Sequence, residues 1–274
     1  LALVDALGAY ADDHPEDITF FYETAAKKLI INNDGDIEGV SGITRGNKKV
    51  NIFSSNVILS SGGFEGNAEM LSHYVGPQAQ FIRPVSRGGH YNRGEGVQMA
   101  LDAGAASCGD FGSFHAQPVD PRSKDMEPVV LNYSYGLLIN ESGLRFTDEA
   151  PALVDSTYEA VTRIIMQQKN GIAYAVFDSK LDDISNWNAT VRSRVAPLQS
   201  DTLRDLASQI NFPTDEFLST IEEFNQSCPD DNSNFDPLKP DGLKTDNLIP
   251  QKSNWSRPLD SGPFRAWPII CSNC

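Results

Sequence analysis

The pattern of apolar and polar positions predicts a β-rich segment early in the chain. Between residues 17 and 59, short runs rich in β-branched residues alternate with turn signals, which is typical of a β meander. Asp34-Gly35 supplies one hairpin turn and residues 45–48 supply the next, because Asp, Asn and Gly adopt tight-turn conformations at little cost. We expect strands at 17–22, 25–31, 37–43, 50–53 and 57–59.

Helical spacing of apolar residues dominates elsewhere. Residues 1–12 form an amphipathic pattern, and the segment 214–226 begins after Pro213 with acids in its first turn, where the helix dipole favours them. A long stretch poor in apolar residues predicts a long ordered loop or a linker at 228–262. The expected helices are 1–12, 94–105, 156–168, 201–210 and 214–226, and short strands are expected at 137–140 and 172–177.

Composition argues against two classes of partner. The 274 residues are 40% hydrophobic, which is enough for one or two domains. The formal net charge of -15 argues against nucleic acid and against anionic membrane surfaces. No apolar run approaches the ~18 residues needed to span a bilayer, and residues 1–12 carry no basic signal-peptide region. We therefore expect a cytoplasmic protein without membrane insertion.

An acidic chain needs a local positive patch to attract an anionic substrate. Three arginines and a histidine lie close together, at Arg83, Arg87, His90 and Arg93. This stretch is either an anion-attracting rim or a solvated loop, and the sequence leaves both interpretations open.

The four cysteines predict neither a metal site nor a redox site. Cys108 and Cys228 are isolated, and we expect them to be buried or half-buried thiols. Cys271 and Cys274 form a CxxC pair, but no second ligand pair accompanies it.

The stretch 56–67, NVILSSGGFEGN, is the best pointer to a bound nucleotide. An apolar run, which we expect to be a buried strand, ends at Ser60-Ser61-Gly62-Gly63. Paired glycines after such a strand let a backbone approach a ligand closely, because no Cβ stands in the way. The GxGxxG fingerprint of dinucleotide-binding folds is absent from the sequence.

Six segments in order resemble the fumarate reductase/succinate dehydrogenase flavoprotein family. The resemblance is greatest to the branch that includes tricarballylate dehydrogenase and the flavocytochrome fumarate reductases. It implies an α/β fold, namely part of a Rossmann-like FAD-binding domain with an inserted α+β capping domain. The segments are 24–29 with 35–40, 57–64, 91–105, 114–118, 138–149, and 201–207 with 220–225.

The resemblance also implies a domain organisation. Residues 1–112 correspond to the central part of the FAD-binding domain, residues 113–262 to the capping domain, and residues 263–274 to the start of the return to the FAD-binding domain. Since the family opens with a GxGxxG turn and closes with a second flavin-contacting segment, we expect this chain to be an internal fragment that binds FAD poorly alone.

The implied activity is FAD-dependent oxidation or reduction of a CH–CH bond in a small carboxylate such as tricarballylate, fumarate or succinate. Hydride moves to or from flavin N5, and an unidentified donor or acceptor supplies or removes the electrons. Glu95 stands where the family has the acid of its TGDG motif. The residues that the resemblance assigns to the cofactor are Ala26, Ser61, Gly62, Gly63 and Glu95.

The catalytic residues are harder to assign. By resemblance, His115 holds a substrate carboxylate. The family's proton-donating arginine follows the segment that matches 138–149, but residues 150–155 contain no arginine. Arg163 is the next one along the chain, and Tyr158 is a candidate neutral acid, as are Tyr133 and Tyr135.

Two alternatives to this activity stay open. The missing arginine favours a non-catalytic relative or a ligand-binding fragment. A ketosteroid-type dehydrogenase that uses a tyrosine acid on an uncharged substrate is the second alternative. Arg145 we assign to structural support of its turn.

Overall fold

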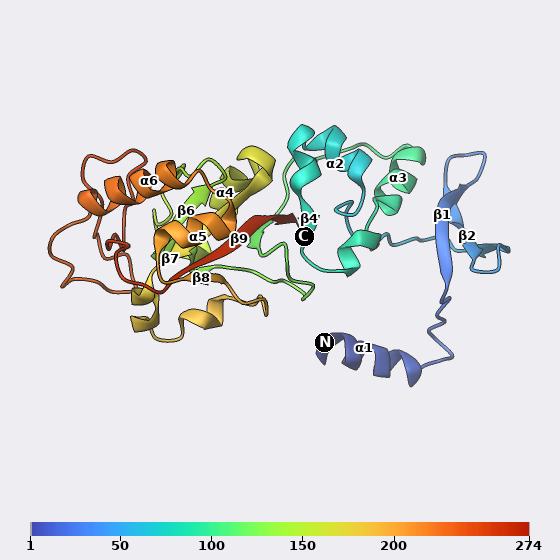
Figure 1. The fold of residues 1–274 in the computed structure, drawn as a ribbon. Coiled ribbons are helices and arrows are strands. Elements are labelled where there is room, and N and C mark those ends of the chain that lie inside the picture. The colour runs from blue at the N-terminus through green and yellow to red at the C-terminus, as the bar shows by residue number, and fades with distance from the viewer. Residues whose placement is uncertain (1, 274) are drawn as a thin grey trace. The chain divides into compact units, whose positions relative to one another are not determined.

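The computed structural model describes residues 2–273, which form two compact units. The first unit comprises residues 2–63 and 94–108, and the second comprises residues 64–93 and 109–273. Each unit mixes helices and strands, as the α/β prediction requires (Figure 1). Leu1 of the expected first helix and Cys274 of the CxxC pair lie outside the described residues.

The first unit is built on a three-stranded antiparallel sheet in the order β1-β2-β3. The hairpin prediction is confirmed, because the Asn32 side chain accepts hydrogen bonds from the backbone N–H groups of Asp34 and Asp36, both at 2.9 Å. Gly35 has a φ of +92°, a conformation that glycine adopts without strain. The elements are α1 (Ala2–Asp12), β1 (Thr24–Ile31), β2 (Ile37–Thr44), β3 (Lys49–Phe53) and α3 (Glu95–Asp102).

Two strand predictions in this unit are wrong. Residues 17–22 and 57–59 have extended or turn-like backbone without ladder partners among the described residues. A strand needs a neighbour for its N–H and C=O groups, so β-branched composition alone does not produce one. The run at 57–59 is also not buried, since Ile58 is 90% exposed.

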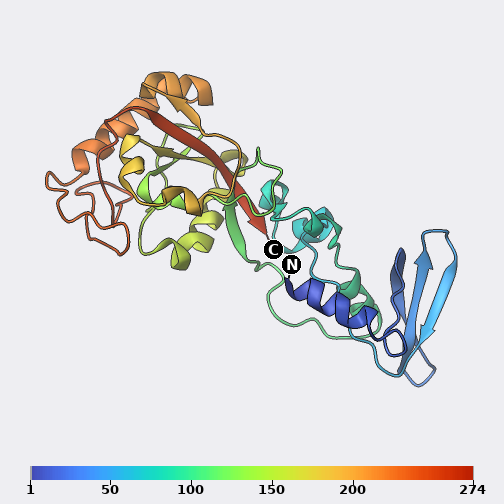
Figure 2. The ribbon, with the colours of Figure 1, turned by 90° about the horizontal axis from the view of Figure 1, so that it is seen from below.

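The second unit contains a six-stranded sheet organised around one long strand, β9, the long red arrow of Figure 2. Strands β5, β7 and β8 pair antiparallel with β9, whereas β4 pairs parallel with it. The expected strands at 137–140 and 172–177 are β6 and β7. The bounds are β4 (Arg83–Pro84), β5 (Ala116–Val119), β6 (Leu137–Asn140), β7 (Ile172–Phe177), β8 (Leu198–Ser200) and β9 (Phe264–Asn273).

Helices cover both faces of this sheet. Leu138 packs in the cluster that contains Val161 and Ile165 of α4, whereas its neighbour Leu137 packs with Leu206 of α5 and with α6. This alternation follows from the strand period of two, and it buries an apolar layer on each side. The helices are α2 (Ala68–Tyr74), α4 (Val154–Met166), α5 (Leu203–Ile210) and α6 (Thr214–Ser227).

Short 3-10 helices connect these elements. They are η1 (Pro77–Phe81), η2 (Gly88–Tyr91), η3 (Asn132–Tyr135), η4 (Lys169–Gly171), η5 (Ser179–Asp183) and η6 (Trp187–Thr190). The long loop at 228–262 is ordered, as predicted, by polar contacts to the body of the unit. Ser253 donates from Oγ to Asp148 at 2.5 Å, and Arg145 Nη1 donates to the Pro250 carbonyl at 2.8 Å.

One cysteine prediction is wrong. Cys108 is exposed, because it lies in an irregular segment after α3 that packs against no core cluster. Cys228 is half-buried and Cys271 is buried, and burial raises the pKa of each thiol to about 12. In the part of the chain that the structure describes, no helix is long and apolar enough to cross a membrane.

Candidate functional site

The three residues expected to catalyse lie together in the second unit. His115 immediately precedes β5, and Tyr158 and Arg163 lie on α4. The Tyr158 hydroxyl is 3.0 Å from Nε2 of His115. Glu159 joins them, with Oε2 at 3.4 Å from Nδ1 of His115 and Oε1 at 2.9 Å from Nη2 of Arg163. We call these four residues the His115 cluster.

Helix geometry explains why α4 presents this set. Glu159 and Arg163 are four residues apart, so their side chains lie on the same face one turn apart. Val161 and Ile165 are buried in the core. The apolar side of α4 thus fixes the helix against the sheet, while His115 and Glu159 keep 40% and 45% of their side-chain surface exposed.

Hydrogen bonding fixes the protonation pattern of the cluster. The hydrogen bond from Arg163 is the largest cause that lowers the pKa of Glu159, and the positive charge of Arg163 adds to it. An ionised carboxylate only accepts hydrogen bonds, so Nδ1 of His115 carries the hydrogen that faces Glu159. In the neutral imidazole, Nε2 then accepts a hydrogen bond from the Tyr158 hydroxyl.

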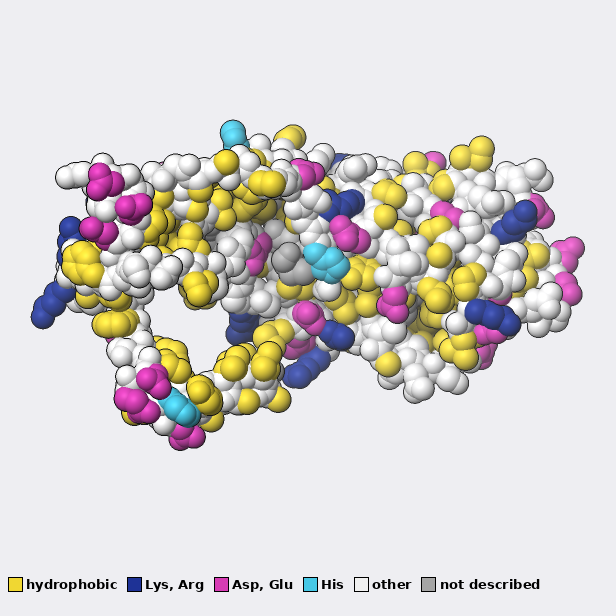
Figure 3. All heavy atoms as spheres, turned by 180° about the vertical axis from the view of Figure 1, so that it is seen from behind, with side chains coloured by type: hydrophobic (Ala, Val, Ile, Leu, Met, Phe, Trp, Pro, Cys, Tyr) yellow, Lys and Arg dark blue, Asp and Glu magenta, His cyan; other side chains and the backbone are white. Residues whose placement is uncertain are grey.

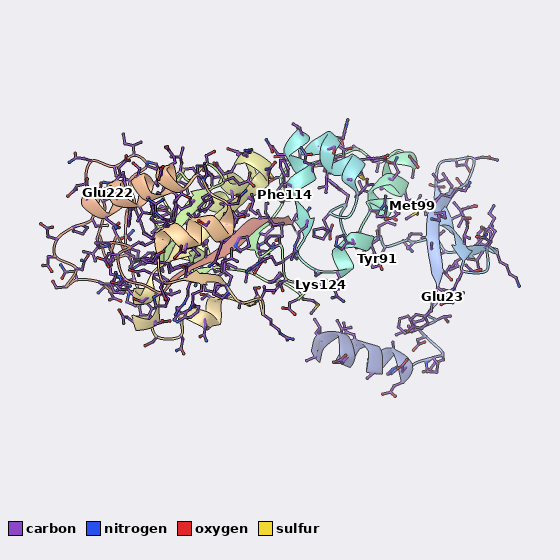
Figure 4. All side chains as sticks on the ribbon, in the orientation of Figure 1. Glu23, Tyr91, Met99, Phe114, Lys124 and Glu222 are labelled. Atoms are coloured by element: carbon purple, nitrogen blue, oxygen red, sulfur yellow. The ribbon has the colours of Figure 1, made fainter. Side chains whose placement is uncertain are left out.

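Three contacts hold the Arg163 side chain in place. Besides Glu159, its guanidinium donates to the backbone carbonyl of Phe114 and lies 4.4 Å from the centroid of the Phe114 ring (labelled in Figure 4). A guanidinium held by a carboxylate, a carbonyl and a ring is well placed to orient Glu159. Its expected role as proton donor stays a prediction.

Arg145 and Glu149, just before the residues 150–155 that lack the family's arginine, have a structural role. Arg145 and Glu149 form a buried ion pair with bonds of 3.0 and 2.7 Å, and their side chains are 4% and 0% exposed. This confirms the assignment of Arg145 to structural support. Tyr133 is fully buried in the core cluster against which Tyr158 packs, and the Tyr135 hydroxyl donates to the Pro237 carbonyl at 2.7 Å.

The cofactor candidates gather in the first unit, at the N-terminus of α3. The backbone N–H of Gly94 donates to the Gly63 carbonyl at 3.0 Å. A Cβ added to Gly96 lies 2.2 Å from Oγ of Ser61, so only glycine lets Ser61 lie against the first turn of the helix. Gly62 has a φ of +78°. Ser61, Gly62 and Gly63 thus form a concave stretch of backbone, which we call the cradle, beside the N–H groups that begin α3. Such a surface suits a phosphate or a flavin edge.

Glu95 and Ala26 complete this set. Glu95 is exposed in the first turn of α3, and Ala26 has an exposed side chain on β1, the strand that lies beside α3. A carboxylate, a hydroxyl and glycine backbone fit the polyol and amide edges of a flavin nucleotide. The donor set does not suit a metal, and the described residues contain no group of three or more His, Cys, Asp or Glu able to hold one.

Sequence reasoning missed Glu159. The Glu159–Arg163 spacing at i and i+4 was visible on the expected helix, but its meaning depends on His115, which lies 43 residues before Tyr158 in the chain. Nothing in the sequence shows that the two segments meet.

No family model matches the chain. It is 26% identical over 237 residues to the vinyl phenol reductase of Lactiplantibacillus plantarum, covering 75% of this chain and 47% of that protein. It is 26% identical over 217 residues to the NADH:acrylate oxidoreductase of Vibrio harveyi, covering 76% and 21%. It is 20% identical over 250 residues to the NADH:fumarate oxidoreductase of Klebsiella pneumoniae, covering 91% and 24%.

Two solved structures share the fold. The open conformation of a flavocytochrome c3 fumarate reductase matches with a TM-score of 0.66 at 21% identity, covering 91% of this chain and 40% of that one. The 3-ketosteroid delta1-dehydrogenase of Sterolibacterium denitrificans matches with a TM-score of 0.60 at 19% identity, covering 91% and 48%. In each comparison the chain spans less than half of the matched protein. The chain is therefore a homologue of the fumarate reductase-like flavoprotein oxidoreductases and corresponds to a part of their length.

Proposed function

We propose that this chain is part of an FAD-dependent oxidoreductase that reduces or oxidises a C–C bond in a small carboxylate, such as fumarate, succinate or tricarballylate. The observation that carries the proposal is the His115 cluster, in a chain homologous to fumarate and acrylate oxidoreductases. When bound, FAD supplies or accepts the hydride at N5, and the protein has to supply or accept the proton.

We assign the role of proton donor or acceptor to Tyr158. Its hydroxyl is a neutral acid in contact with His115, and no arginine is present in residues 150–155 to take that role. In the direction of reduction, Tyr158 donates its proton to the carbon next to the one that receives hydride. The Tyr158 phenolate is then reprotonated from solvent through the half-exposed His115: Nε2 takes up a solvent proton and passes it to the phenolate, and ionised Glu159 stabilises the imidazolium formed in between.

Arg163 is then a positioning residue that holds Glu159 toward His115. The cradle at Ser61, Gly62 and Gly63, with Glu95 and Ala26, is assigned to the cofactor. Residues 1–112 accordingly belong to the FAD-binding part and residues 113–262 to the capping part. The electron donor or acceptor is a separate molecule that this chain does not identify.

A ketosteroid-type dehydrogenase is the second candidate. It is favoured by the same tyrosine hydroxyl, which suits an uncharged substrate, and by the shared fold with a 3-ketosteroid dehydrogenase. Both candidates use Tyr158 as the acid or base, and they differ in the charge of the substrate.

A substrate panel separates these candidates. The protein that contains this chain is loaded with FAD, reduced without oxygen, and mixed with fumarate, acrylate or a steroid enone, while flavin absorbance reports reoxidation. Rapid reoxidation by a carboxylate supports the first candidate, and reoxidation by the steroid alone supports the second. A flavin-loaded protein that reacts with none of them contradicts both and favours a non-catalytic relative.

A further inference from the structure

A basic pocket in the second unit is separate from the His115 cluster. It has a volume of about 210 Å³ and lies between the turn that follows β4 and the loop 123–125. Three cationic side chains line it, from Arg83, Arg87 and Lys124, together with His90 and one carboxylate, Asp125. Lys124 is labelled in Figure 4. From the sequence, the stretch 83–93 could be either an anion-attracting rim or a solvated loop. In the structure, part of this stretch lines a defined cavity.

The cationic side chains of this pocket make no close ion pair among the described residues. Arg83 donates to the carbonyls of Pro121 at 3.2 Å and Ser123 at 3.4 Å, and its buried Nε has no hydrogen-bond partner among the described residues. Within that same part of the chain, Arg87 and Lys124 form no ion pair, whereas most other arginines do.

The two acids nearest these cations make hydrogen bonds of their own. Asp125 accepts from Oγ of Ser123 at 2.8 Å and from the backbone N–H of Arg194 at 3.3 Å. Asp120 accepts two bonds from Arg122, at 3.0 and 2.9 Å. Asp125 feels the charge of Arg87, and Asp120 that of Arg83. The three cationic side chains still outnumber the one carboxylate that lines the pocket, in a protein of net charge -15. Burial lowers the pKa of Arg83, and an anion in contact with it offsets that desolvation cost.

The pocket wall is fixed by close packing. A Cβ added to Gly89 lies 2.7 Å from Cβ of Pro84, and a Cβ added to Gly66 lies 2.5 Å from the carbonyl oxygen of His90. Glycine at both positions lets the turn at 88–91 pack directly against β4 and residue 66. The lining residues are therefore presented in a set arrangement, which lowers the entropic cost of binding.

The pocket and the His115 cluster lie at opposite ends of β5. His115 precedes this strand of 4 residues, and the loop containing Ser123 and Lys124 follows it. At a strand rise of about 3.3 Å per residue, the two are separated by roughly 10 Å or more.

We propose that this pocket binds a small oxyanion with at least two negatively charged oxygens. Arg83, Arg87 and Lys124 supply the positive charge, and His90 supplies a further hydrogen-bonding group. A phosphate group and a short dicarboxylate share this chemistry and fit the volume. The inference does not depend on the proposed function, because it concerns binding and not turnover.

The test is calorimetric titration of the 274-residue chain with inorganic phosphate and, separately, with succinate, using chloride at matched ionic strength as the reference. We expect saturable binding of phosphate, succinate or both, and none of chloride. The double variant Arg87→Gln/Lys124→Gln weakens binding about tenfold or more, since charged hydrogen bonds to the anion are lost. Both positions are exposed, so folding is retained.

The matched control is Lys169→Gln/Arg204→Gln, which removes the same charge from another surface. It should bind as the parent chain does. Competition between phosphate and succinate shows that one pocket binds both anions. Binding of only one of them shows whether the natural ligand carries a phosphate group or two carboxylates. The proposal is overturned if neither anion binds at about 10 mM, if the double variant binds unchanged, or if the control variant loses as much affinity.

Discussion

The two units differ in how they bury apolar side chains. All four core clusters lie in the second unit, around β6, β7 and β9. Among the described residues of the first unit, Ala11 and Met99 are the only buried hydrophobic side chains. Many others are exposed there, including Leu3, Val4 and Leu7 along α1, where hydrophobic side chains lie on the molecular surface (Figure 3).

This difference sets what each unit can hold in place. The His115 cluster rests on a packed helix and sheet, so its side chains have a fixed geometry. The cradle at Ser61 and Gly96 rests on backbone hydrogen bonds and glycine contacts without a core cluster beneath it. We infer that the free energy of unfolding comes mainly from the second unit and that the first opens at lower cost.

The largest contrast is expected from truncating a core side chain. Phe217 of α6 is 0% exposed in the second unit, whereas Ile58 of the first unit is 90% exposed. Phe217→Ala should lower the free energy of unfolding by about 4 kcal/mol, and Ile58→Ala by less than about 0.5 kcal/mol. Denaturant unfolding followed by circular dichroism measures both. Equal losses contradict the inferred difference between the units.

The ion pairs provide a second contrast. In the second unit, the side chains of the ion pair Arg145–Glu149 are 4% and 0% exposed. In the first unit, the side chains of the ion pair Arg45–Glu23 are 78% and 61% exposed. Glu149→Gln leaves a buried guanidinium uncompensated and should cost about 3 kcal/mol. Glu23→Gln should cost less than about 1 kcal/mol. The same unfolding assay applies, and a tolerated Glu149→Gln argues against a dry, well-packed second unit.

The pH dependence gives the smallest effect. Burial lowers the pKa of Lys252 to about 8, from 10.5 for a free lysine. Between these values the unfolded chain binds more protons at Lys252, so this lysine makes the free energy of unfolding rise with pH, by about 1 kcal/mol from pH 8 to 9. The raised pKa values of Cys228 and Cys271 oppose this contribution from about pH 8 upward, because the unfolded thiols lose their protons first.

Lys252→Met removes the contribution of Lys252, so between pH 8 and 9 the free energy of unfolding of this variant should fall by about 1 kcal/mol relative to that of the parent chain. Lys28→Met on exposed β1 controls for the loss of a lysine. Chemical unfolding at pH 7.5, 8, 8.5 and 9 provides the comparison. The same pH dependence in the Lys252→Met variant and in the parent chain contradicts the assignment to Lys252.

The sequence predicted local features better than long-range ones. The hairpin of β1 and β2 and the helices α5 and α6 follow from turn chemistry and helical spacing, which act within a few residues. The strand expected at 57–59 failed because a strand requires a partner that composition does not supply. β9 was not foreseen as the central strand, since its role depends on pairing with segments more than 60 residues away.

The same holds for the candidate site. His115, Tyr158 and Arg163 were named separately, on resemblance and on side-chain chemistry, and the fold brings them together. Glu159 was not named, because its carboxylate acquires a role only when β5 and α4 meet. The basic stretch at 83–93 could not be distinguished from a solvated loop, since the loop 123–125 that closes its pocket lies far along the chain.

The central claim is that Tyr158, in contact with His115, transfers the substrate proton. The most direct measurement is the rate at which the reduced, FAD-loaded protein containing this chain is reoxidised by its substrate, compared between Tyr158→Phe and Tyr174→Phe. Tyr174 lies on β7 and packs against Phe212, in the cluster with α5 and α6. We predict a loss of about 10²–10⁴-fold for Tyr158→Phe with substrate affinity retained, and parental rates for Tyr174→Phe. A Tyr158→Phe variant that is reoxidised at the parental rate contradicts the claim.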